Sequence, residues 1–148
     1  MIQAGRKKRI EAGEMMLQRL REILRGDPRV KFAYAFGSVV TGSAGPLSDI
    51  DVAVYLDAKT DAFVVQAALM ERLIRGLGVE KVDLVILNNA PSVLRYAVIS
   101  DGKVIKEDKP RRVQFEVATL TEYLDFLPFR AAQSASIRRH IGKGDYFG

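Results

Sequence analysis

Apolar residues recur every three to four positions in four stretches of the chain, the spacing typical of helices that bury one face. The first predicted helix begins near Met16, after a start that Gly13 interrupts, and the second ends at Gly76 and Gly78. The fourth predicted helix, at the C-terminal end of the chain, is expected to break near Pro128, because proline lacks the backbone N–H that a helix interior needs. The predicted helices cover about 16–25, 61–75, 91–99 and 110–140.

Between these helices lie four shorter apolar runs with the pattern of strands. Their predicted ranges are 30–36, 49–56, 80–87 and 103–106, the last preceded by a hairpin-like turn at Asp101-Gly102. This alternation predicts an α+β fold, close to α/β, with a small mixed sheet and helices packed on one side. We expect a single domain over residues 1–148, with a core at about 16–107 and a C-terminal helical region at about 110–141.

The composition is that of a globular protein, with 48% hydrophobic and 28% charged residues. No apolar run has the length of a bilayer span, and the basic N-terminus leads into no signal-like apolar segment, so we expect a cytoplasmic protein without a membrane partner. The lack of cysteine in the sequence excludes disulfides and thiolate metal sites. The formal charge of +5 comes partly from basic clusters that either meet a phosphate-rich partner or form solvated helix ends. Because no aromatic residues are interleaved with them, we expect no nucleic-acid partner.

The predicted strand 30–36 ends abruptly in Gly37-Ser38, and a loop rich in glycine and small residues follows. Such a loop bends tightly and lets a ligand approach its backbone. The amides of Gly37 and Ser38 and the Ser38 hydroxyl are therefore candidates for binding phosphate oxygens. Gly37 and Gly42 have the glycine spacing of a P-loop, but Ser43-Ala44 stand where Lys-Ser/Thr is needed, and the sequence contains no GxGxxG. Both the P-loop and the dinucleotide-binding interpretations are excluded.

Three aspartates are candidate metal ligands. Asp49 and Asp51 lie on one face of the predicted strand, about 6–7 Å apart, and two carboxylates repel unless a cation compensates. Hard oxygen ligands of this kind select Mg²⁺ or Mn²⁺. Asp83 interrupts an otherwise apolar strand; if that strand neighbours the first, Asp83 faces the same metals and could take a proton from an attacking group. The alternative is that Ser48-Asp49 caps a turn and Asp51 is merely exposed; Asp57, about 20 Å along the strand from Asp51, is a poorer candidate.

The order Gly37-Ser38, ten residues, Asp49-Ile50-Asp51 resembles the signature of the DNA polymerase β-like nucleotidyltransferase superfamily. Within it, the chain is similar to the minimal nucleotidyltransferases (MNT) that serve as MntA-type antitoxins in HEPN–MNT toxin–antitoxin pairs. The similarity runs from about residue 30 to 129 and includes Val82-Asp83-Leu84-Val85, Pro91-Ser92-Val93-Leu94-Arg95-Tyr96, Asp101-Gly102-Lys103 and Glu122-Tyr123-Leu124-Asp125-Phe126.

This resemblance implies the polymerase β-like nucleotidyltransferase fold and an adenylyltransferase that uses ATP and Mg²⁺. Its implied reaction places AMP on a tyrosine of a HEPN ribonuclease toxin and silences it. Asp49, Asp51 and Asp83 would be the catalytic and metal-binding residues, and Gly37 and Ser38 would contact the nucleotide. Family members commonly carry an arginine where this chain has Thr41, which removes a triphosphate contact; Lys81, Arg95 or another basic residue could replace it.

Two other functions stay open from the sequence. One is a binding module that neutralises a toxin by contact, with a vestigial nucleotide site. The other is nucleotide transfer to RNA or a small molecule, although residues 110–148 are few and basic for an added substrate-binding domain. Tyr123, Phe126 and Phe129 either dock a partner or belong to the core. Both homo-oligomers and hetero-oligomers with the toxin are compatible with the sequence.

Overall fold

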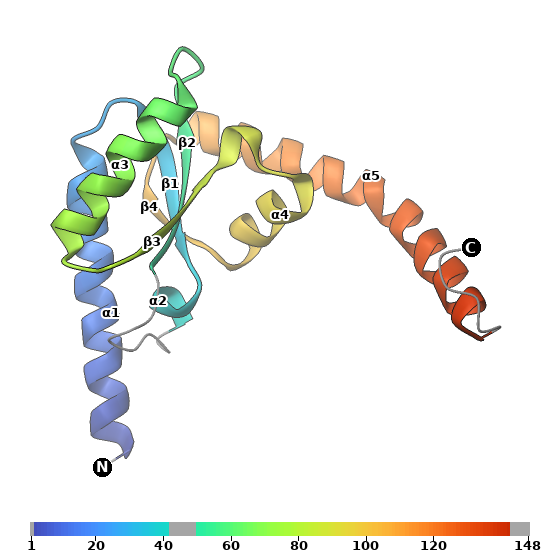
Figure 1. Ribbon diagram of the computed structural model, residues 1–148, viewed down its shortest axis with the longest axis horizontal. Coiled ribbons are helices and arrows are strands. Elements are labelled where there is room, and N and C mark those ends of the chain that lie inside the picture. The colour runs from blue at the N-terminus through green and yellow to red at the C-terminus, as the bar shows by residue number, and fades with distance from the viewer. Residues whose placement is uncertain (1, 42–49, 143–148) are drawn as a thin grey trace.

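The computed structural model describes residues 2–41 and 50–142, in which helices and strands alternate as the sequence predicts. Figure 1 shows their arrangement around a central sheet. The elements are α1 (Ile2–Arg25), β1 (Val30–Phe36), α2 (Ser38–Thr41), β2 (Ile50–Leu56), α3 (Ala62–Leu77), β3 (Val82–Ile86), the 3-10 helix η1 (Leu87–Asn89), α4 (Ser92–Asp101), β4 (Lys103–Lys106) and α5 (Lys109–Gly142). None of the helices in these two ranges combines the length and apolar character that a bilayer crossing requires.

The four strands form one mixed sheet in the order β3-β2-β1-β4. Strand β1 pairs antiparallel with both β2 and β4, whereas β2 and β3 are parallel. Parallel neighbours need a long crossover connection, and α3 supplies it between β2 and β3. The predicted mixed sheet of an α+β fold is confirmed.

Helices cover both faces of this sheet, so the prediction of helices on one side only is wrong. The reason lies in β1, where Ala33 and Ala35 face one apolar cluster and Phe32 and Tyr34 face another. A strand with apolar side chains on both faces must be covered on both. Helices α1 and α3 pack against the alanine face, and α4 and α5 against the aromatic face (Figure 1).

Two glycines expected to interrupt or end helices lie inside them. Helix α1 continues through Gly13, which is buried, and a Cβ there would lie 3.1 Å from the carbonyl oxygen of Val39 in α2. Helix α3 likewise continues through Gly76, where a Cβ would lie 2.6 Å from Cδ1 of Ile23 in α1. Both glycines permit close packing against another element. The residue that ends α3 is Gly78, whose φ of 67° favours glycine.

The second half of the chain differs from prediction in two connections. Helix α4 runs on to Asp101, so Asp101-Gly102 is a helix end rather than a hairpin-like turn. Helix α5 continues past Pro128 without the predicted break. A proline removes one helical hydrogen bond, but Phe129-Arg130-Ala131-Ala132 resumes with alanine and arginine, which favour helix.

Helix α5 is held to the sheet and to α4 by aromatic and polar contacts. Phe115 packs against Phe32, with ring centroids 5.5 Å apart, and the hydroxyl of Tyr34 donates a hydrogen bond to Glu116. Burial and this carboxylate raise the pKa of Tyr34. Tyr123 stacks on Tyr96 of α4 at 3.7 Å, which favours the core interpretation of Tyr123 over partner docking. Beyond these contacts, α5 extends away from the sheet (Figure 1).

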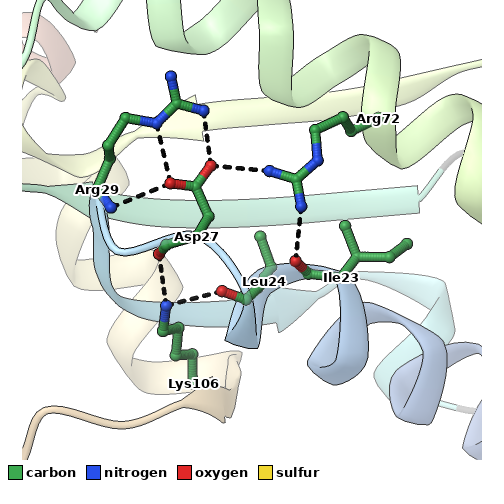
Figure 2. A network of polar contacts seen from close by, with 6 residues as sticks. All are labelled: Ile23, Leu24, Asp27, Arg29, Arg72 and Lys106. Carbon is green, nitrogen blue, oxygen red and sulfur yellow. Dashed lines mark hydrogen bonds and ion pairs between the residues drawn. The ribbon is translucent and has the colours of Figure 1, made fainter.

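A buried carboxylate, Asp27, ties the end of α1 to β1 and α3 (Figure 2). Its side chain is 1% exposed and accepts hydrogen bonds from Arg29, at 2.8–3.0 Å, and from Nη1 of Arg72 at 3.0 Å. The Nζ of Lys106 in β4 donates to the carbonyl oxygens of Asp27 and Leu24, both at 2.7 Å. The hydrogen bond from Arg29, aided by the charges of Arg29 and Arg72, lowers the pKa of Asp27 to about 2. This network fixes the start of β1.

Candidate nucleotidyl-transfer site

The carboxylates of Asp51 and Asp83 come from neighbouring parallel strands. Asp51 of β2 lies directly opposite Asp83 of β3 in the sheet register. Two residues further on, Ala53 and Val85 contact the aromatic cluster, so both carboxylates lie on the sheet face that α4 and α5 cover. Asp51 is half-buried, and the side chain of Asp83 is 47% exposed. The condition that the sequence left open for Asp83, that its strand neighbours the strand of Asp51, is met.

The turn after β1 brings Gly37 and Ser38 to the same place. Phe36, the last residue of β1, pairs with Asp51, and Gly37 follows with a φ of 75°. A Cβ built on Gly37 would overlap Oδ2 of Asp51, so only glycine fits between the turn and the carboxylate. Ser38 then opens α2, where the N–H of Val40 donates to the carbonyl oxygen of Gly37 at 3.1 Å. The structure thus places four of the five predicted site residues together.

Asp49, the fifth, lies outside the described residues, as do Gly42 and Ser43-Ala44 of the loop. Within residues 2–41 and 50–142, no group of three or more histidine, cysteine or carboxylate side chains could hold a metal ion. The described part of the site is therefore a pair of carboxylates, and the role of Asp49 stays a prediction.

Of the two basic residues considered as replacements for the arginine, Lys81 lies at the carboxylates. Its Nζ is 3.8 Å from Oδ1 of Asp83, a long and exposed ion pair. Arg95 lines a cavity with Tyr55 and Asp57, at the opposite end of β2 from Asp51. The structure therefore leaves Lys81, and not Arg95, near the Asp51–Asp83 pair.

A cavity of about 560 Å³ opens beside the Gly37 turn. Its walls are Phe36 and Gly37 on one side and the C-terminal half of α4 on the other, including Ala97, Ser100 and Asp101. This volume lies in the range of small-molecule sites. The sequence alone does not predict Ala97, Ser100 or Asp101 as part of the site. The only sequence feature at this place is a pair of small residues, Ala97 and Ser100, on a short helix. Small residues alone do not identify a ligand site.

These features define the class of the protein. Residues 18–111 match the family model described as polymerase beta, nucleotidyltransferase. The chain belongs to this nucleotidyltransferase family.

Among its relatives, the chain is 34% identical over 96 residues to the protein adenylyltransferase MntA of Shewanella oneidensis, covering 65% of this chain and 68% of that protein. It also resembles a chain of a solved toxin–antitoxin structure with AMP-PNP, with a TM-score of 0.70, 28% identity and coverage of 82% of this chain and 98% of that one. A structure of tri-AMPylated Shewanella oneidensis HEPN toxin in complex with MNT antitoxin gives a TM-score of 0.66, 27% identity and coverage of 85% and 98%.

Proposed function

We propose that this protein is an antitoxin that transfers AMP from ATP to a tyrosine of a HEPN ribonuclease toxin in the cytoplasm and thereby silences it. The observation that carries the proposal is the pairing of Asp51 with Asp83 beside the Gly37-Ser38 turn. Two relatives support it: one is a protein adenylyltransferase, and one structure holds an AMPylated HEPN toxin with its MNT antitoxin.

The donor set fits Mg²⁺ or Mn²⁺. Carboxylate oxygens are the ligands that these hard cations prefer, and two like charges paired across a sheet are unfavourable without a cation. Asp51 and Asp83, with Asp49, would hold the metal, which when bound neutralises charge on the phosphates. Asp51 and Asp83 are paired in the sheet, and we propose that the cation they bind is Mg²⁺ or Mn²⁺.

The remaining residues act on the nucleotide and the acceptor. The amides at Gly37-Ser38 bind phosphate oxygens, and the cavity between Phe36 and α4 holds the nucleoside. Asp83, nearly half exposed, accepts the proton of the tyrosine hydroxyl. The tyrosine oxygen forms a bond to the α-phosphorus, the bond from that phosphorus to the bridging oxygen breaks, and pyrophosphate leaves.

The acceptor tyrosine must be positioned partly by the toxin itself. Asp83 lies on β3, an edge strand of the sheet, and its side chain is open to solvent. An exposed site can admit a side chain of another protein, which a closed pocket for a small acceptor cannot. This exposure favours a protein acceptor over a small molecule.

One feature favours a second function, neutralisation of the toxin by contact alone. Thr41 stands where relatives of the predicted family commonly have an arginine. Co-expression with the toxin separates the two functions. Transfer predicts that Asp51→Asn abolishes protection of the cells, while Glu71→Gln, which alters an exposed carboxylate paired with Arg75 on α3, preserves it. Protection by Asp51→Asn at the wild-type level would support the contact function instead.

A further inference from the structure

A second cavity, of about 480 Å³, opens at the end of β2 away from Asp51. Segments distant in the sequence converge on it: Lys31 comes from β1, Asp57 follows β2, Arg95 lies on α4 and Arg111 on α5. Six residues of extended strand separate Asp57 from Asp51, a distance of about 20 Å. The proposed transfer reaction uses none of the residues of this cavity.

The charged side chains that line the cavity are mainly basic. Lys31, Arg95 and Arg111 face a single carboxylate, Asp57, whose Oδ2 lies 3.5 Å from Nζ of Lys31. The backbone N–H of Lys59 and the charges of Lys31 and Arg111 lower the pKa of Asp57. Nε of Arg111 also lies 3.7 Å from Oδ2 of Asp108, so three cations and two carboxylates leave a net positive charge of one around the cavity, which attracts anions.

Arg95 provides a further donor at this place. Its Nη2 donates to the carbonyl oxygen of Asn88 at 2.6 Å, and its guanidinium lies 5.5 Å from the ring centroid of Phe115. Its Nε is buried and has no hydrogen-bond partner among the described residues. A buried donor without an acceptor is unfavourable, and an anionic oxygen brought within hydrogen-bond distance of Nε would satisfy it.

We propose that this cavity is a second ligand site that binds a phosphate group, either as free phosphate or as part of a nucleotide. Lys31 and Arg111 supply charge at the rim, and Arg95 supplies the planar guanidinium that suits phosphate oxygens. The volume exceeds the needs of phosphate alone, and the walls include the rings of Tyr55 and Phe115, which offer apolar surface to a nucleoside.

The test is calorimetric titration of the full chain with inorganic phosphate and, separately, with AMP, both without divalent cations. The wild type is compared with the double variant Lys31→Ala/Arg111→Ala. The matched control, Arg25→Ala/Arg75→Ala, removes the same charge from exposed positions on α1 and α3 outside the cavity. We expect binding to be about tenfold weaker in the first variant, a loss of about 1.4 kcal/mol, and unchanged in the control, because only the first variant removes charge from the cavity.

A variant that is expected to bind phosphate more tightly separates an effect on the site from a loss of folding, because an unfolded protein would not gain affinity. Asp57→Asn removes the one carboxylate that lines the cavity and should tighten phosphate binding several-fold, while Glu71→Gln, at an exposed position on α3, should leave it unchanged. Tighter binding of AMP than of phosphate would identify a nucleotide as the ligand, and equal binding would identify free phosphate. The proposal is overturned if neither probe binds at millimolar concentration, or if the two double variants bind alike.

Discussion

Asp51 and Asp83 lie directly opposite each other on the parallel strands β2 and β3. Like charges opposed across a sheet are destabilising by roughly 0.2–1 kcal/mol, and Lys81, at 3.8 Å from Asp83, is too exposed to offset much of this. A cation that joins the pair would relieve this repulsion.

This relationship predicts how the melting temperature responds to magnesium. Mg²⁺ should raise the melting temperature of the wild type, because it binds the folded pair and not the unfolded chain. Asp83→Asn should melt at or above the wild-type temperature in chelator and gain less from Mg²⁺. Differential scanning fluorimetry with and without Mg²⁺ measures both, with Glu71→Gln as the control that responds like the wild type. An equal Mg²⁺ response in Asp83→Asn would contradict the assignment of this residue as a ligand.

Gly37 and Gly78 form a matched pair for testing the turn. Both have positive φ, 75° and 67°, so alanine at either position strains the backbone by about 1–2 kcal/mol. Only at Gly37 would the added Cβ overlap the carboxylate of Asp51; at Gly78 it meets nothing within 4 Å. Gly37→Ala should therefore lose adenylyl transfer by at least about tenfold, while Gly78→Ala loses stability but keeps activity. Similar activity in the two folded variants would show that the overlap with Asp51 does not matter.

Asp27 makes stability depend on pH in the acid range. Its pKa is about 2 in the folded protein against an ordinary 3.8, so the folded state favours the ionised form. The resulting stability, about 2 kcal/mol, is fully present above pH 4 and is lost as the pH falls through 2. Urea unfolding of the wild type should show this decline between pH 4 and 2, and Asp27→Asn should be less stable at pH 7 with a flatter dependence. A parallel decline in the variant would assign the acid sensitivity to other carboxylates.

The parts of the site that the sequence predicts are those formed by residues close together in the chain. The turn at Gly37-Ser38 and the start of β2 are local features of this kind. Asp83 is also predicted from its local sequence, because it is a charged residue within an apolar strand. The cavity between Phe36 and α4 was missed because its walls are brought together only by packing of the helix on the sheet. The cavity near Arg95 was missed for the same reason, since its charged residues come from four separate segments.

The errors in the predicted fold have physical causes of the same kind. The sequence predicts Gly13 and Gly76 as helix breakers, but each lies where another element approaches the helix too closely for a side chain. That approach is a tertiary contact, which the local sequence does not predict. The covering of both sheet faces was, in contrast, visible in β1, where the alanines that alternate with Phe32 and Tyr34 are apolar too.

The most direct test of the central claim is transfer of label from ATP carrying a radioactive α-phosphate to the purified HEPN partner in the presence of Mg²⁺. We predict that the wild type and Glu71→Gln label a tyrosine of the partner, and that Asp51→Asn reduces labelling by at least about a hundredfold, the size of effect expected when charge stabilisation at the reacting phosphate is lost. Absence of label with the wild type, or equal labelling by Asp51→Asn, would contradict the proposed adenylyl transfer.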